Sequence, residues 1–215
     1  MKFRKIFIAL ASAVVTHIAY AVPMYNPLGA QSNVALSTVT GGGWTQCYQA
    51  TMSEFIGNDA GIALAKCGDG DLLMMAGRQT GSDTLLALAE GNKTQIFADT
   101  GHTSVTHTVN GAEWWFSQEW SWGFTALGDT VSNSQCDTSD SPLSMCLHTV
   151  SSYGGYRINN ITGLNNSLAY EKLLFVSSSG STPNNVPEPE SLALLGAGLI
   201  GFAATRRKSP KKQTA

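Results

Sequence analysis

Short apolar or alternating stretches recur along the middle of the chain, and turn-forming residues separate them. Strands of this kind at a spacing of about ten residues are typical of antiparallel sheets. The expected strands lie at 72–76, 84–89, 94–98, 105–109, 113–116 and 173–176. The pattern therefore predicts an all-β domain, folded as a sandwich or as a barrel-like sheet.

Helical periodicity is weak, and only residues 52–65 read as a helix, with Gly57 and Gly61 weakening it. We expect the β domain at 22–176, with a loosely attached lead-in at 22–31 and the folded part from Asn33 onward. A Ser- and Asn-rich stretch at 177–185 reads as a polar linker. About 160 residues suffice for one domain with a real core.

Residues 1–21 have the three parts of a secretory signal peptide. Lys2, Arg4 and Lys5 come first, an apolar stretch follows at 6–18, and Ala19 and Ala21 form a small-x-small cleavage site. We expect signal peptidase to cut after Ala21. The alternative is an uncleaved anchor.

A second apolar segment, 191–205, is uncharged and precedes a basic cluster of Arg206, Arg207 and Lys208. As a helix its 15 residues would rise about 22 Å, somewhat short of a typical span. Snorkelling flanks or a thinned bilayer would absorb that mismatch. We expect a transmembrane helix here, with a hydrophobic core helix as the alternative reading.

The tail, taken as a whole, resembles the PEP-CTERM sorting signal of Gram-negative bacteria, over 186–212. The resemblance is carried by the apolar helix, the basic end and the run Val186-Pro187-Glu188-Pro189. It implies recognition and cleavage by exosortase, a transient inner-membrane anchor, and then release or transfer to the cell surface or extracellular matrix. Such proteins often accompany exopolysaccharide and biofilm production. The tail is also labelled an ice-binding protein C-terminal domain, a label that says nothing of ice binding.

The body resembles a recurring, uncharacterised bacterial extracellular module, which implies a shared fold and paired cysteines but no known activity. The landmarks are Gly43-Trp44, Cys47-Tyr48, Cys67, Leu72-Leu73-Met74, Trp122-Gly123-Phe124, Cys136-Asp137, Cys146-Leu147-His148-Thr149 and Thr162-Gly163-Leu164-Asn165.

Charge is distributed unevenly along the chain. Five basic and 13 acidic residues between positions 22 and 185 give that part a formal charge of −8, although the whole chain carries only −2. An acidic body repels phosphate backbones, so nucleic acid is not an expected partner. The same charge is compatible with cation binding.

All four cysteines, Cys47, Cys67, Cys136 and Cys146, lie in the exported part, where disulfides are the default. Three pairings exist, and we favour Cys47–Cys67 with Cys136–Cys146 because these close short loops. A zinc site is the alternative, but neither a Cys-x-x-Cys pair nor a histidine at ligand spacing supports it.

Four of the five tryptophans gather in one segment, and they are the candidates for ligand binding: Trp114, Trp115, Trp120 and Trp122. Core packing is the favoured reading. The alternative is an exposed aromatic surface on which sugar rings stack. We expect Trp120 and Trp122 to share one face of a strand.

Candidate catalytic groups are sparse. His102, His107 or His148 with a carboxylate would make a secreted hydrolase, yet neither a Gly-x-Ser-x-Gly elbow nor a His-Glu-x-x-His helix is present. The Asp-rich turns 68–71 and 137–140 would suit calcium, although ordinary turn chemistry explains them and no cofactor is expected. The sequence favours an exported, non-catalytic surface or matrix protein that binds exopolysaccharide or other matrix components.

Overall fold

The computed structural model describes residues 24–177, apart from 69, 133–135, 139–141 and 151–152. The predicted signal peptide, nearly all of the polar linker and the predicted transmembrane helix lie outside the described residues. Within the described part, no helix is long and apolar enough to cross a membrane.

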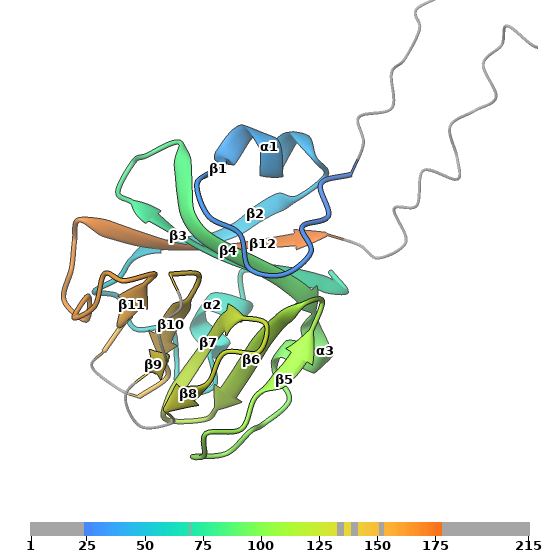
Figure 1. The fold of residues 1–215 in the computed structure, drawn as a ribbon. Coiled ribbons are helices and arrows are strands. Elements are labelled where there is room, and N and C mark those ends of the chain that lie inside the picture. Colours follow the sequence, from blue (N-terminus) through green and yellow to red (C-terminus); the bar gives the residue numbers. More distant parts are fainter. Residues whose placement is uncertain (1–23, 69, 133–135, 139–141, 151–152, 178–215) are drawn as a thin grey trace, which may run out of the picture. The chain divides into compact units, whose positions relative to one another are not determined.

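The described residues are mostly β, with three short helices, which confirms the all-β prediction (Figure 1). The helices are α1 (Leu36–Gly41), α2 (Gly61–Leu64) and α3 (Lys93–Ile96). The strands are β1 (Val34–Ala35), β2 (Thr45–Thr51), β3 (Leu72–Gln79), β4 (Thr84–Asn92), β5 (His107–Val109), β6 (Ala112–Ser117), β7 (Ser121–Ala126), β8 (Val131–Ser132), β9 (Asp137–Thr138), β10 (Met145–His148), β11 (Arg157–Ile158) and β12 (Tyr170–Ser177).

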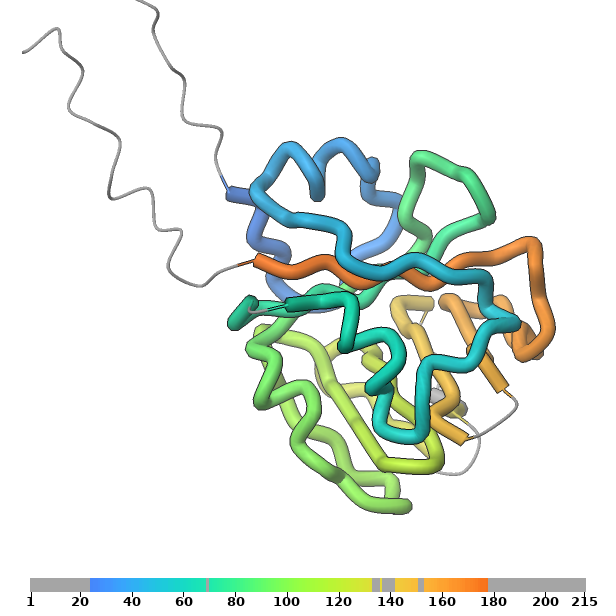
Figure 2. Tube along the Cα trace, turned by 180° about the vertical axis from the view of Figure 1, so that it is seen from behind, coloured from blue at the N-terminus to red at the C-terminus, as the bar shows by residue number. Residues whose placement is uncertain are grey.

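These strands form two five-stranded antiparallel sheets and one small ribbon. Sheet A has the order β1-β4-β3-β12-β2, sheet B has the order β11-β10-β7-β6-β5, and β8 pairs with β9. β12 lies between β3 and β2, so this last strand of the domain pairs with an earlier strand along each of its two edges. Figure 2 shows this from behind, with orange β12 alongside the blue and green strands.

One hydrophobic cluster draws on both sheets and forms the core between them. Side chains alternate along each strand, so β3 sends Leu73 and Met75 into this cluster and Met74 and Ala76 to the other face. Sheet B contributes Trp114, Trp122, Phe124, Met145, Leu147 and Ile158. Two sheets that share one core make a sandwich.

The other face of sheet A is also apolar, and α1 and the beginning of the described chain cover it. Val39 of α1 and the following Trp44 pack there with Tyr25. The amide of Tyr25 donates to the carbonyl of Gly42 (2.9 Å), and the Trp44 Nε1–H donates to the carbonyl of Tyr25 (2.7 Å). Residues 24–31 are therefore an integral part of the fold, and the prediction of a loosely attached lead-in is wrong for them.

The structure differs from two local predictions for identifiable reasons. Residues 94–98 were expected as a strand, but Asn92 caps a helix there: its Oδ1 accepts from the amides of Thr94 (3.0 Å) and Gln95 (3.4 Å). Residues 52–65 were the one stretch that could be helical, and only α2 forms within it, because Gly57 takes a φ of 101° that interrupts a longer helix.

Both expected disulfides are present, Cys47–Cys67 and Cys136–Cys146. The first joins β2, at the edge of sheet A, to the turn after α2. The second lies against the outer face of sheet B, where it packs with Trp115 and Val131. All four cysteine side chains form disulfides and none is left to bind a metal, so the zinc alternative is wrong.

Candidate functional site

The four clustered tryptophans occupy three different environments. Trp114 and Trp122 are fully buried between the sheets, and Trp115 is buried on the outer face of sheet B. Trp120 alone is half-buried. The prediction of core packing therefore holds for Trp114, Trp115 and Trp122, whose rings are too buried to contact a ligand.

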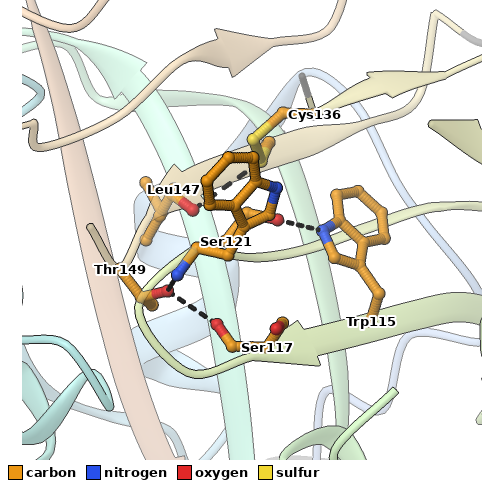
Figure 3. Close-up of a disulfide and its surroundings, with 8 residues drawn as sticks. Trp115, Ser117, Ser121, Cys136, Leu147 and Thr149 are labelled. Carbon is orange, nitrogen blue, oxygen red and sulfur yellow. Dashed lines mark hydrogen bonds between the residues drawn. A yellow bond between two sulfur atoms is a disulfide. The ribbon is translucent and has the colours of Figure 1, made fainter. Parts of the chain in front are cut away.

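Trp115 is fixed over its neighbouring strand. Its Nε1–H donates to the Oγ of Ser121 at 3.1 Å, as Figure 3 shows. The facing position on β7 is Gly123, where a Cβ would collide with the Trp115 ring. A glycine at this position is what allows the indole to lie flat against the sheet beneath the disulfide.

Trp120 lies in the turn between β6 and β7, just before β7, so it does not share a strand with Trp122 as expected. Thr149 holds this turn on both sides. The Trp120 amide donates to the Thr149 Oγ (2.7 Å), and the Thr149 amide donates to the Trp120 carbonyl (3.1 Å). The Thr149 hydroxyl donates to the Ser117 carbonyl (2.7 Å), as Figure 3 shows. The backbone that presents the indole is therefore well anchored.

The residue before Trp120 is held from another loop. Glu119 takes a left-handed φ of 58°, and its amide donates to the carbonyl of Asn58 at 2.7 Å. The Asn58 side chain donates back to the Glu119 carboxylate at 3.3 Å. Glu119 itself is exposed and directly precedes Trp120 in the chain.

Two histidines flank Trp120. The exposed His102 meets the indole edge-on, with ring centroids 3.6 Å apart. His148, at the end of β10, hydrogen-bonds to the Trp120 backbone, and its ring lies 5.6 Å from that of Tyr153, which is 44% exposed. We call Trp120, His102, Glu119, His148 and Tyr153 together the Trp120 surface.

Burial sets the charge state of His148. Desolvation lowers its pKa from the ordinary 6.5, while hydrogen bonds to the Trp120 backbone and to the Asn165 side chain oppose that shift. The imidazole is therefore neutral at pH 7, and it serves the surface as a ring and a hydrogen-bonding group.

His107 lies apart from the other two histidines. It belongs to β5, directly opposite Trp114 of β6, and its Nε2 is buried without a hydrogen-bond partner in the described part of the chain. The structure thus brings His102 and His148 to the same tryptophan and leaves His107 near the core.

The two candidate calcium turns fall partly outside the described residues, since Asp69 and 139–141 are not among them. Over the residues that are described, no group of three or more His, Cys, Asp or Glu side chains is placed to hold a metal ion.

Sequence reasoning missed Tyr153 as a part of this surface, and it missed Thr149 and Asn58 as the residues that hold its turn. Asn58 lies before α2, Thr149 and Tyr153 both follow β10, and none of the three bears a catalytic or binding motif. The only sequence signal at Thr149 was its place directly after His148, and sequence spacing alone does not reveal a hydroxyl that closes a distant turn.

Glu90 and Lys172 are buried ionisable groups elsewhere in the fold, and burial shifts the pKa of each. Glu90 of β4 is 3% exposed. The side-chain amide of Asn110 donates to the Glu90 Oε1 at 2.5 Å and to the Pro27 carbonyl at 2.8 Å. The Glu90 Oε2 has no hydrogen-bond partner among the described residues. Desolvation raises the pKa of Glu90 to about 7, against a smaller lowering by Asn110.

Lys172 of β12 is fully buried and points toward the core, where Gly77 and Ala50 are its neighbours across the two adjoining strands. Its Nζ donates to the carbonyls of Thr51 and Glu54. Desolvation lowers its pKa to about 7, and Glu54 opposes that shift. This lysine fastens the chain that follows β2 to the middle of sheet A.

Comparison with known proteins gives one match, which lies outside the described residues. No curated protein and no solved structure matches the chain significantly. A known motif, described as the PEP-CTERM protein-sorting motif, matches residues 185–208. The chain therefore carries a PEP-CTERM protein-sorting motif, which indicates export, exosortase-type processing, and sorting through the membrane to the cell envelope or surface.

Proposed function

We propose that this protein is an exported, non-catalytic component of the cell surface or extracellular matrix, and that its β domain binds exopolysaccharide. The sorting motif at 185–208 carries the proposal, because it assigns the chain to the envelope or surface. A disulfide-bonded sandwich suits that location, since disulfides persist outside the cytoplasm.

The binding role is supported by the one tryptophan of the cluster that stays accessible. A half-buried indole beside exposed polar groups offers an apolar face and hydroxyl-binding partners at the same place. Folds by themselves do not assign activities, so the proposal rests on the motif and on this surface.

Substitution within the Pro-Glu-Pro run tests the sorting part of the proposal. Changing Pro187 and Glu188 to Ala should leave the protein in the membrane fraction, with residues beyond the motif still attached. The measurement is fractionation of the cells together with the intact mass of the protein recovered from each fraction.

The matched control is Glu190→Ala, which changes the same residue type just outside the run and should be processed normally. If surface protein carried residues 206–215 intact, exosortase processing would be excluded. Co-sedimentation with the producing cell's own exopolysaccharide tests the binding part separately.

A further inference from the structure

We infer that the Trp120 surface is a glycan subsite and that it takes an uncharged or amino-bearing pyranose chain, in preference to a uronic-acid polymer. This inference rests on the proposed function and adds the place of binding and the chemical class of the ligand.

The first support is the order of the backbone that carries an accessible ring. Binding costs less when the contact group is already ordered, and Thr149 fixes both the amide and the carbonyl of Trp120 before any ligand arrives. Glu119 is fixed in turn by Asn58. Two other loops therefore hold the backbone of the hairpin turn that carries the indole.

The second support is the mixture of groups around that ring. The His102 ring lies perpendicular to the indole and in contact with it, and Tyr153 adds a second accessible aromatic ring beyond His148. Pyranose rings carry an apolar C–H face and equatorial hydroxyls, so aromatic faces bordered by imidazole and carboxylate groups suit them.

The third support is charge. The cations that a uronic-acid chain would need are mostly engaged: Arg78 is buried against Glu171, Lys172 is buried, and the Lys93 ammonium donates to the carbonyls of Cys67 and Gly68. Glu119, the residue directly before Trp120, is exposed and carries a carboxylate. An anionic polymer would meet repulsion here, whereas neutral sugars would not and ammonium groups would be attracted.

The test is calorimetric titration of the exported protein, purified from the envelope or the medium, with three hexasaccharides. The probes are cellohexaose, which is neutral, the fully deacetylated glucosamine hexamer, which is cationic, and a guluronic-acid hexamer, which is anionic. We expect binding of the first two and none of the third.

Trp120→Ala should weaken that binding at least about tenfold, as the loss of a central aromatic contact does. Trp120→Phe keeps an aromatic ring at this position and should therefore retain part of the binding affinity. Leu127→Ala is the matched control, because Leu127 is an apolar side chain, 62% exposed, that follows the opposite end of β7. A circular dichroism spectrum of each variant establishes that the domain is folded.

Glu119→Gln separates the two ligand types. Removing the carboxylate should weaken the binding of the glucosamine hexamer by about threefold, which is the usual contribution of an exposed charge pair. The affinity for cellohexaose should stay unchanged. A preference for the guluronic-acid hexamer would overturn the charge assignment.

The outcomes also distinguish this inference from the proposed function. Binding that is equal in the wild type and in Trp120→Ala would refute the Trp120 surface while leaving an exopolysaccharide-binding protein. Absence of binding to every hexamer and to the native exopolysaccharide would refute the binding role itself.

Discussion

A single buried carboxyl, Glu90, joins the beginning of the described chain to both sheets. It belongs to β4 of sheet A, while its partner Asn110 precedes β6 of sheet B and also holds the Pro27 carbonyl. One carboxylate oxygen lacks a partner among the described residues. An ionised carboxylate is costly in such a place, so the fold favours the protonated form.

Glu90 therefore makes stability depend on pH. The folded protein holds this proton up to about pH 7, whereas the unfolded chain releases it near the ordinary value of 4.5. The contribution of Glu90 to the free energy of unfolding is thus greatest below pH 4.5, falls as pH rises, and is lost above about pH 7.

Glu90→Gln should remove this dependence, because glutamine accepts from Asn110 but does not titrate. In urea unfolding followed by circular dichroism, the variant should gain stability relative to the wild type between pH 5 and pH 8. Glu119→Gln, at an exposed site, is the control and should show no such gain. A constant difference between Glu90→Gln and wild type at both pH values would contradict the burial argument.

At the scale of elements, short capping interactions decide what the hydrophobic pattern leaves open. Residues 94–98 end in a short apolar run that is consistent with a strand, yet the Asn92 side chain satisfies two amides that a helix exposes at its start. The longer strands β3, β4, β6 and β12 were predictable because each contains an apolar run, and the runs are separated by turn-forming residues. Very short strands such as β1, β8 and β11 depend on tertiary pairing, which the local sequence does not encode.

Asn92→Ala should cost about 1 kcal/mol of stability, the usual effect of losing an N-cap, with α3 fraying. Asn92→Asp, which keeps an acceptor at the same position, should recover most of it. The free energy of unfolding in urea measures both. If the alanine and aspartate variants were equally stable, the cap would not be what holds α3.

At the scale of the whole molecule, the sequence predicted the all-β class and the pairing of cysteines, because alternation and export are local or compositional signals. It did not predict which tryptophan would be accessible. Trp114, Trp115, Trp120 and Trp122 look alike by spacing, and only the hairpin turn and the contacts of Thr149 distinguish them. It also missed the role of residues 24–31, which lack regular structure and pack through backbone hydrogen bonds.

Those residues should be needed for full stability. A mature chain that begins at Ser32 would lose the Tyr25–Gly42 bond and the pairing of Gln31 with Leu88, and would expose the outer face of sheet A. We expect it to unfold at a lower urea concentration than a chain that begins at Val22.

A double-mutant cycle checks the cause of this loss. Trp44→Phe keeps an aromatic ring but removes the N–H that the Tyr25 carbonyl accepts. The substitution should destabilise the longer chain and have little effect on the shorter one. Equal effects in both chains would show that Trp44 acts independently of the N-terminal segment.

The position of β12 has a mechanical consequence. The chain leaves the described domain from the end of this strand, and Ser177 there donates to the Gly43 carbonyl, next to the glycine that holds Tyr25. Any tension transmitted from the following segment enters sheet A along β12, which is bonded on both edges, and so loads two ladders of hydrogen bonds together. A glycan held at Trp120 would pull on sheet B instead. The load would then pass through the contact between the two sheets, so the resistance of the domain to pulling would depend on how well that contact is packed.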